Sequence, residues 1–167
     1  VAAVEVGRGV PEVAERQLVR GDLEQDVLLS LEIYEVPAGL LELELTETLL
    51  MTSNDHTIAM LQNLHAAGLQ IAIGDFGTGH CTPAYLRGFP VNKLKIARSL
   101  IRDITRSSDA DAITSAITRM GHSLDLELIA EGVETAPQLA FLRAHHCDQI
   151  QGSYFSPALP AVSYTHL

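Results

Sequence analysis

The chain has 167 residues, of which 47% are hydrophobic and 19% charged, a composition that predicts a single globular domain with its own core. Its 11 basic and 21 acidic residues give a formal net charge of −10, which excludes a surface that binds nucleic-acid polymers through their phosphate backbone. No apolar run approaches the ~18 residues of a membrane span and the N-terminus lacks a secretory layout, so we expect a cytoplasmic protein, unless segments outside this chain anchor the full-length protein to a membrane.

Helical and strand-like patterns alternate along the chain. They predict helices at 23–34, around 58–64, from 82, around 113–120 and from 135, separated by strands at 41–46, 70–75, 93–97, 126–131 and 148–153. Gly68 and Gly121 each follow the last periodic residue of a helix and are expected to end it. Thr135 and Gln138 have the spacing of a capping box. The alternation predicts a parallel sheet, either a barrel or a doubly wound sheet.

No internal repeat, low-complexity tract or linker composition divides the chain, so we assign residues 1–161 to one domain. Residues 162–167 follow the last recognisable element without any pattern. We treat them as a tail outside the domain that resembles a sequence artefact.

Three carboxylates stand at or near the ends of predicted strands. Glu44 alternates with leucines in the strand at 41–46, which is either a half-exposed edge strand with solvated glutamates or part of a site. Asp75 and Glu131 end later strands, and parallel strands present their carboxyl ends on one rim. We therefore expect the three side chains to converge. Oxygen ligands without His or Cys suit hard cations such as Mg²⁺, Mn²⁺ or Ca²⁺.

Lys95 lies between two apolar residues of a short predicted strand. It is either a surface lysine on a peripheral strand or, near the carboxylates, a group that orients a metal-bound water or stabilises phosphoryl charge. With the carboxylates, it indicates metal-assisted phosphoester hydrolysis.

Five ordered motifs resemble the C-terminal two-thirds of the EAL domain, a cyclic-di-GMP-specific phosphodiesterase family. They are ELTE at 44–47, DFGTG at 75–79, PVNKLKI at 90–96, AEGVET at 130–135 and QG at 151–152. The resemblance runs from about residue 14 to residue 161 and identifies residues 1–161 as a partial EAL domain. It implies an α/β fold that is an incomplete TIM-like (β/α)8 barrel lacking the N-terminal strand or strands.

The resemblance also implies hydrolysis of cyclic di-GMP to linear pGpG with two divalent cations, Mg²⁺ or Mn²⁺. The implied metal ligands are Glu44, Asp75 and Glu131, with Glu12 at the position of a further metal-binding residue. The implied catalytic residues are Lys95, which would contact the attacking water, and Glu134. The implied substrate-side residues are Gln151, Thr78 and Glu47, the last bracing the loop after residues 75–79.

The chain departs from the family pattern at two acids. Gly74 replaces the first of two adjacent aspartates, so we expect one cation to be weakened or lost. Ala97 replaces the aspartate that follows the Lys-Ile pair. The glutamate of the EAL signature belongs to a strand upstream of this chain. These differences predict impaired activity.

Two alternatives to an impaired phosphodiesterase stay open. The first is a catalytically inactive EAL-like module that binds cyclic di-GMP or a protein partner, and the second is a fragment of an active enzyme. The family resemblance further implies a homodimer of the complete domain, and allows diguanylate-cyclase or sensory domains in the full-length protein.

Overall fold

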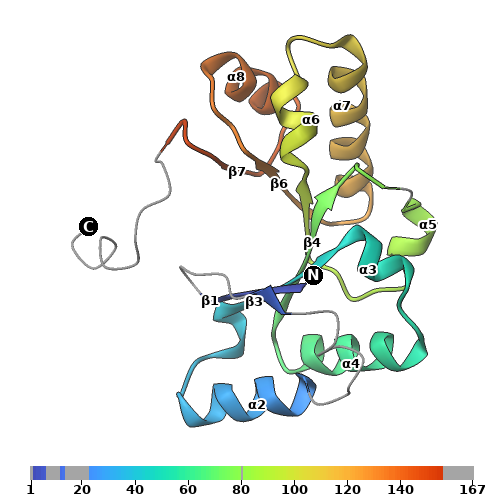
Figure 1. The fold of residues 1–167 in the computed structure, drawn as a ribbon, viewed down its shortest axis with the longest axis vertical. Helices are drawn as coiled ribbons and strands as arrows, with labels where there is room; N and C mark the ends of the chain where they lie inside the picture. Colours follow the sequence, from blue (N-terminus) through green and yellow to red (C-terminus); the bar gives the residue numbers. More distant parts are fainter. Residues whose placement is uncertain (1, 7–11, 14–22, 80, 156–167) are drawn as a thin grey trace. The chain divides into compact units, whose positions relative to one another are not determined.

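A computed structural model of the chain describes residues 2–6, 12–13, 23–79 and 81–155 (Figure 1). The chain forms two compact units, the first made of residues up to 74 together with 79–93, and the second of 75–78 together with 94 onward. The predicted tail at 162–167 lies outside the described residues.

The first unit contains the strands β1 (Ala2–Val6), β2 (Glu12–Val13), β3 (Leu41–Thr46) and the first five residues of β4 (Gln70–Phe76), in the order β2-β1-β3-β4. β1 is antiparallel to β2 and β3, whereas β3 and β4 are parallel, with Thr46 opposite Gly74. Its helices are α2 (Leu23–Ile33), the 3-10 helix η1 (Ala38–Leu40), α3 (Glu47–Met51), α4 (Asp55–Ala66) and α5 (Pro83–Leu86).

β3 shows why the leucine–glutamate alternation forms a strand. Leu41, Leu43 and Leu45 are buried on one face, while Glu42 and Glu44 on the other face are half-buried. β3 lies between β1 and β4, so the interpretation as an edge strand is wrong. The prediction of a strand at 41–46 is confirmed in both bounds.

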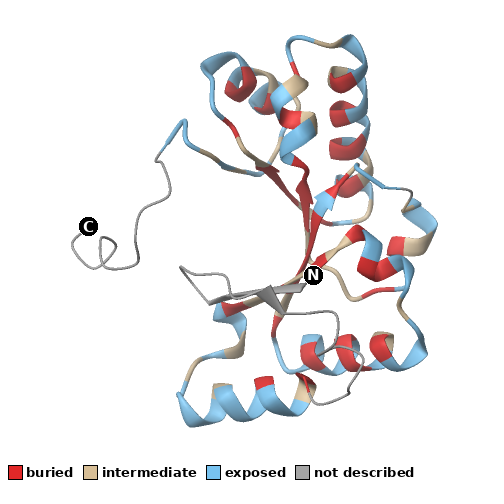
Figure 2. Ribbon diagram, viewed as in Figure 1, coloured by how far each residue is buried: buried red, intermediate tan, exposed pale blue. Residues whose placement is uncertain are grey.

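The second unit contains most of β5 (Lys93–Ile96), β6 (Glu127–Glu131) and β7 (Gln149–Gln151), in the order β5-β6-β7. β6 and β7 are parallel. The helices are α6 (Arg98–Asp103), α7 (Ser108–Ser123) and α8 (Ala136–Ala144). The predicted capping box of Thr135 and Gln138 is present at the start of α8. Figure 2 shows the buried residues concentrated on the strands and on one side of α7.

The two glycines expected to end helices behave differently. Gly68 follows the end of α4 with a φ of 102°, as predicted for a helix C-terminus. Gly121 lies inside α7, which continues to Ser123, so the prediction that it ends the helix is wrong. A Cβ on Gly121 would come within 2.6 Å of the buried side chain of Leu128. The glycine is therefore needed for close packing of α7 against β6.

Short elements escaped the sequence patterns. α3, α6 and the strands β1 and β2 each have six residues or fewer, too short to display a period. Among the described helices, none has the length and apolar character that crossing a membrane requires.

Candidate functional site

Glu44 on β3 faces Gly74 on the neighbouring strand β4. A Cβ built on Gly74 would lie 3.0 Å from Cδ and 3.2 Å from Cγ of Glu44, and closer still to its Oε1. Real Cβ atoms rarely come so close to another heavy atom, so the Glu44 carboxylate occupies the space that a side chain at position 74 would need. The absence of the family's first aspartate and the position of Glu44 are therefore linked.

Glu47 is the first residue of α3, and its side chain is buried, with the residue only 4% exposed. Its two carboxylate oxygens accept hydrogen bonds from the backbone N–H groups of Gly79, at 3.1 Å, and Cys81, at 2.5 Å. A Cβ on Gly79 would lie 2.8 Å from the carboxyl carbon of Glu47, so only glycine allows this approach. Burial and then the Glu47 charge raise the pKa of the Cys81 thiol. The two hydrogen bonds hold the backbone at the end of the DFGTG motif and just after it, which is the bracing role expected for Glu47.

The start of that loop belongs to the second unit. Asp75 is exposed and has a φ of 53°, a left-handed conformation that costs energy for a residue with a side chain but that Asp tolerates better than most. The Thr78 hydroxyl donates a hydrogen bond to the Asp75 carbonyl at 2.9 Å. A Cβ on Gly77, at a φ of 98°, would lie 2.5 Å from Leu100. The turn that follows the exposed Asp75 is therefore tight.

Lys95 lies on β5 between the fully buried Leu94 and Ile96, and is itself 2% exposed. The interpretation as a surface lysine on a peripheral strand is therefore wrong. Burying an ammonium group costs free energy, and strongly buried ionisable groups are frequent at functional sites, so Lys95 is a candidate site residue.

Glu131 and Gln151 are brought together by the pairing of β6 with β7, in which they are directly opposite one another. Side chains opposite each other on paired strands point to the same face. Glu131 is half-buried and Gln151 exposed. An acid and an amide therefore stand side by side where the two strands end, beside the strand that carries Lys95.

Glu134 lies in the loop that joins β6 to α8, and its Oε1 accepts a hydrogen bond from Nη2 of Arg98 at 2.5 Å. Arg98 is the first residue of α6 and was missed by the sequence analysis. The sequence offered no signal for it, because α6 is too short to display a helical period.

The structure thus groups Asp75, Lys95, Glu131, Glu134 and Gln151 in the second unit, together with Thr78, while Glu44 and Glu47 belong to the first. The expected convergence of Glu44 with Asp75 and Glu131 stays a prediction. Glu12 is on β2, but its side chain lies outside what the structure describes.

The candidate ligands for the implied cations are carboxylates. Within residues 23–79 and 81–155, no three His, Cys, Asp or Glu side chains gather closely enough to hold a metal ion. The described side chains therefore do not present an assembled metal centre.

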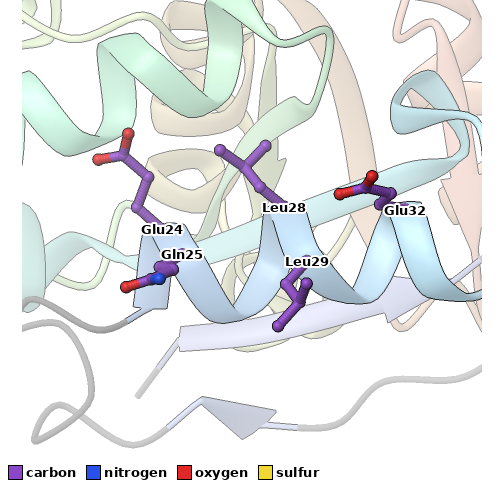
Figure 3. A pocket seen from close by; sticks show the side chains of 5 residues that line it. All are labelled: Glu24, Gln25, Leu28, Leu29 and Glu32. Atoms are coloured by element: carbon purple, nitrogen blue, oxygen red, sulfur yellow. The ribbon is translucent and has the colours of Figure 1, made fainter.

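A cavity of about 480 Å³ lies elsewhere, against α2 (Figure 3). Its lining side chains are Glu24, Gln25, Leu28, Leu29 and Glu32. None of the predicted site residues is among them, and its two glutamates give it no positive charge to attract a phosphate. We therefore do not assign it to the candidate site.

Comparisons with known proteins agree on one family. The family model described as "EAL domain" matches residues 12–158. The chain is similar to the signaling protein YkoW of Bacillus subtilis (strain 168), with 42% identity over 148 residues, covering 89% of this chain and 18% of that protein. It is also similar to the cyclic di-GMP phosphodiesterase NbdA of Pseudomonas aeruginosa, with 46% identity over 143 residues, covering 86% of this chain and 18% of that protein.

Among solved structures, that of the PaMucR phosphodiesterase in complex with c-di-GMP matches with a TM-score of 0.86 and 36% sequence identity, covering 91% of this chain and 62% of that chain. The chain therefore spans less than a fifth of the length of these two curated relatives and under two-thirds of this solved chain.

Proposed function

The chain belongs to the EAL domain family, and from this membership we propose that it is part of a cyclic-di-GMP phosphodiesterase domain whose hydrolytic activity is impaired. The predicted fold class is confirmed: the α/β fold is that of EAL domains and corresponds to a partial TIM-like barrel. The ligand is cyclic di-GMP and the product is linear pGpG.

The observation that carries the proposed impairment is the packing of Glu44 over Gly74. In the family pattern this position bears a carboxylate next to that of Asp75. Here an aspartate would require the Glu44 side chain to turn away, and without that aspartate the chain has one oxygen ligand fewer. Losing one electrostatic partner of the reacting phosphate typically costs ~100-fold or more in rate.

The remaining residues keep roles that suit a phosphodiester ligand. Buried Lys95 places a positive charge where a phosphoryl group or its attacking water can be stabilised. Glu131, Glu134 and Gln151 offer hydrogen-bond acceptors and donors for water and ligand at the ends of β6 and β7. Glu47 holds the backbone at Gly79 and Cys81, shortly after Thr78 in the chain, by accepting their N–H groups.

Divalent cations are part of the proposal because the family resemblance implies them. Glu44, Asp75 and Glu131 are oxygen donors of the kind that Mg²⁺ and Mn²⁺ prefer. Since the described side chains do not assemble a metal centre, no catalytic step is assigned to a bound cation.

A second candidate is a module that binds cyclic di-GMP or a protein partner without hydrolysis. It is favoured by Ala97, which is 1% exposed and leaves no carboxylate after buried Lys95. For the full-length protein we expect a homodimer through the complete domain, companion sensory or diguanylate-cyclase domains and a cytoplasmic location of this domain.

The test combines binding and turnover on the purified chain. Calorimetry with cyclic di-GMP and Ca²⁺ measures binding, and chromatography of pGpG with Mg²⁺ or Mn²⁺ measures hydrolysis. We expect binding with turnover far below the roughly 1 to 1,000 per second that is usual for enzymes. Lys95→Met should remove any residual turnover, while Glu32→Gln on α2 serves as the matched surface control.

The outcomes separate the candidates. Turnover at an ordinary enzymatic rate contradicts impairment, binding with no turnover at all favours the second candidate, and absence of both binding and turnover contradicts the proposed ligand. Residual turnover that survives Lys95→Met would mean a contaminating enzyme or a wrong assignment of the lysine.

A further inference from the structure

Arg98 contacts two residues of the loop between β6 and α8. Its guanidinium donates to the Glu134 carboxylate at 2.5 Å, and its aliphatic stem covers Gly132. A Cβ on Gly132, whose φ is 73°, would lie 2.8 Å from Cδ and 3.1 Å from Cβ of Arg98. One side chain from the start of α6 therefore fits over the backbone of the loop and holds its acid.

The loop backbone is fixed independently by other residues. Val133 donates its N–H to the carbonyl of Gln151 and accepts at its own carbonyl from Tyr154 N–H, both at 3.0 Å. The Gln138 amide oxygen accepts from the Glu134 N–H at 2.8 Å, and its Nε2 donates to the buried carbonyl of Ile101 at 2.9 Å. The loop path thus does not depend on Arg98, which leaves the direction of the Glu134 carboxylate as what Arg98 controls.

The ion pair is poorly suited to a stabilising role. The side chain of Arg98 is 70% exposed and that of Glu134 is 44% exposed, and exposed pairs contribute little to stability. Arg98 also opposes the helix dipole at the first position of α6. What the pair does provide is a preferred orientation for the Glu134 carboxylate, which would otherwise sample several rotamers more evenly.

We propose that Arg98 is a positioning residue that holds Glu134 ready to accept hydrogen bonds from the N–H or O–H groups of the bound cyclic dinucleotide. The inference rests on the proposed function for the ligand, whereas the orientation of Glu134 is a property of the chain alone. Preorganising an acceptor reduces the entropy lost on binding.

The experiment compares Arg98→Ala, Arg98→Lys and Glu134→Gln by calorimetry with cyclic di-GMP and Ca²⁺. Arg98→Ala should weaken binding roughly 2- to 12-fold, the cost of ordering one rotamer-rich side chain, with an unchanged melting temperature. Arg98→Lys should restore part of the loss. In the Glu134→Gln background, Arg98→Ala should have little further effect.

Arg102→Ala is the matched control, because Arg102 lies on the same helix and forms an exposed pair with Asp103 at 3.1 Å. It should leave binding unchanged. An equal effect of the two alanine substitutions, or additive effects of Arg98→Ala and Glu134→Gln, would contradict the positioning role.

A second readout needs no ligand. Three-bond NMR couplings of Glu134 should indicate one χ1 rotamer in the unchanged chain and averaged rotamers in Arg98→Ala. Averaged couplings in the unchanged chain would overturn the Arg98 inference. A chain with a fixed Glu134 that binds no cyclic di-GMP would overturn the proposed function and, with it, the assignment of Glu134 to that ligand.

Discussion

The carboxyl group of Glu44 lies over the backbone of Gly74, with Cδ 3.0 Å from the position that a Cβ on Gly74 would take. The two residues belong to the neighbouring parallel strands β3 and β4. A residue with any side chain at position 74 therefore requires Glu44 to turn away. The glycine at position 74 and the position of the Glu44 carboxyl group therefore depend on each other.

This relationship predicts the result of restoring the missing acids. Gly74→Asp combined with Ala97→Asp, in a complete EAL domain, should raise Mn²⁺-dependent formation of pGpG by about 10-fold or more, because it returns electrostatic partners to the reacting phosphate. Gly74→Asn with Ala97→Asn is the matched control, since it displaces Glu44 equally but adds no charge. Equal rates for the two pairs would show that the defect lies elsewhere.

Removing the Glu47 carboxylate should destabilise the chain. Glu47→Ala leaves the N–H groups of Gly79 and Cys81 without their carboxylate acceptors. We expect a loss of about 1–3 kcal/mol in total, because water can reach the exposed Gly79. Denaturant unfolding measures the change, and amide exchange of Gly79 and Cys81 should accelerate. Glu32→Ala on the exposed face of α2 should change neither quantity. Unchanged exchange in Glu47→Ala would show that the loop does not need this brace.

Replacing Gly121 by alanine should improve the helix propensity of α7 but worsen its packing. Gly121→Ala gains up to ~1 kcal/mol of helix propensity, but its methyl group would come within 2.6 Å of Leu128, and overpacking of this kind costs about 1–3 kcal/mol. We expect a net loss of stability in denaturant unfolding. Pairing it with Leu128→Ala should give a smaller total loss than the sum of the single changes. A more stable Gly121→Ala chain would mean that α7 shifts at no cost.

The Cys147 thiol should react slowly with alkylating reagents. Burial, followed by the Asp148 charge, raises the pKa of Cys147 from 9.0 to about 11, so at pH 8 its reactive thiolate is about 100-fold scarcer than that of a free cysteine. Alkylation followed by mass spectrometry should label Cys147 in the folded chain far more slowly than in the unfolded chain. Equal labelling rates in the two states would contradict the burial effect.

The same shift makes stability depend on pH. Because the folded-state pKa of Cys147 is raised above its unfolded value of 9.0, its contribution is fully present below pH 9 and is lost as the pH rises towards about 11. Unfolding free energies measured across that window should fall less steeply in Cys147→Ala than in the unchanged chain. If the unfolding free energy fell equally steeply with pH in both chains, the loss of stability would come from groups other than Cys147.

Local pattern alone determined much of this protein. The leucine–glutamate alternation located β3 to the residue, Gly68 marked the end of α4, and Thr135 with Gln138 formed the expected capping box, because strand alternation, helix ends and caps depend on residues a few positions apart. The ordered motifs from ELTE to QG were sufficient for the family and the fold class.

Contacts between distant residues were decided only by the tertiary structure. Lys95 is buried and β3 is not an edge strand because of the strands beside them, which neither segment specifies by itself. Arg98 meets Glu134 across 36 positions, and Glu44 meets Gly74 across neighbouring strands. Side-chain packing of this kind depends on which surfaces the fold brings together, and periodicity along the chain carries no information about it.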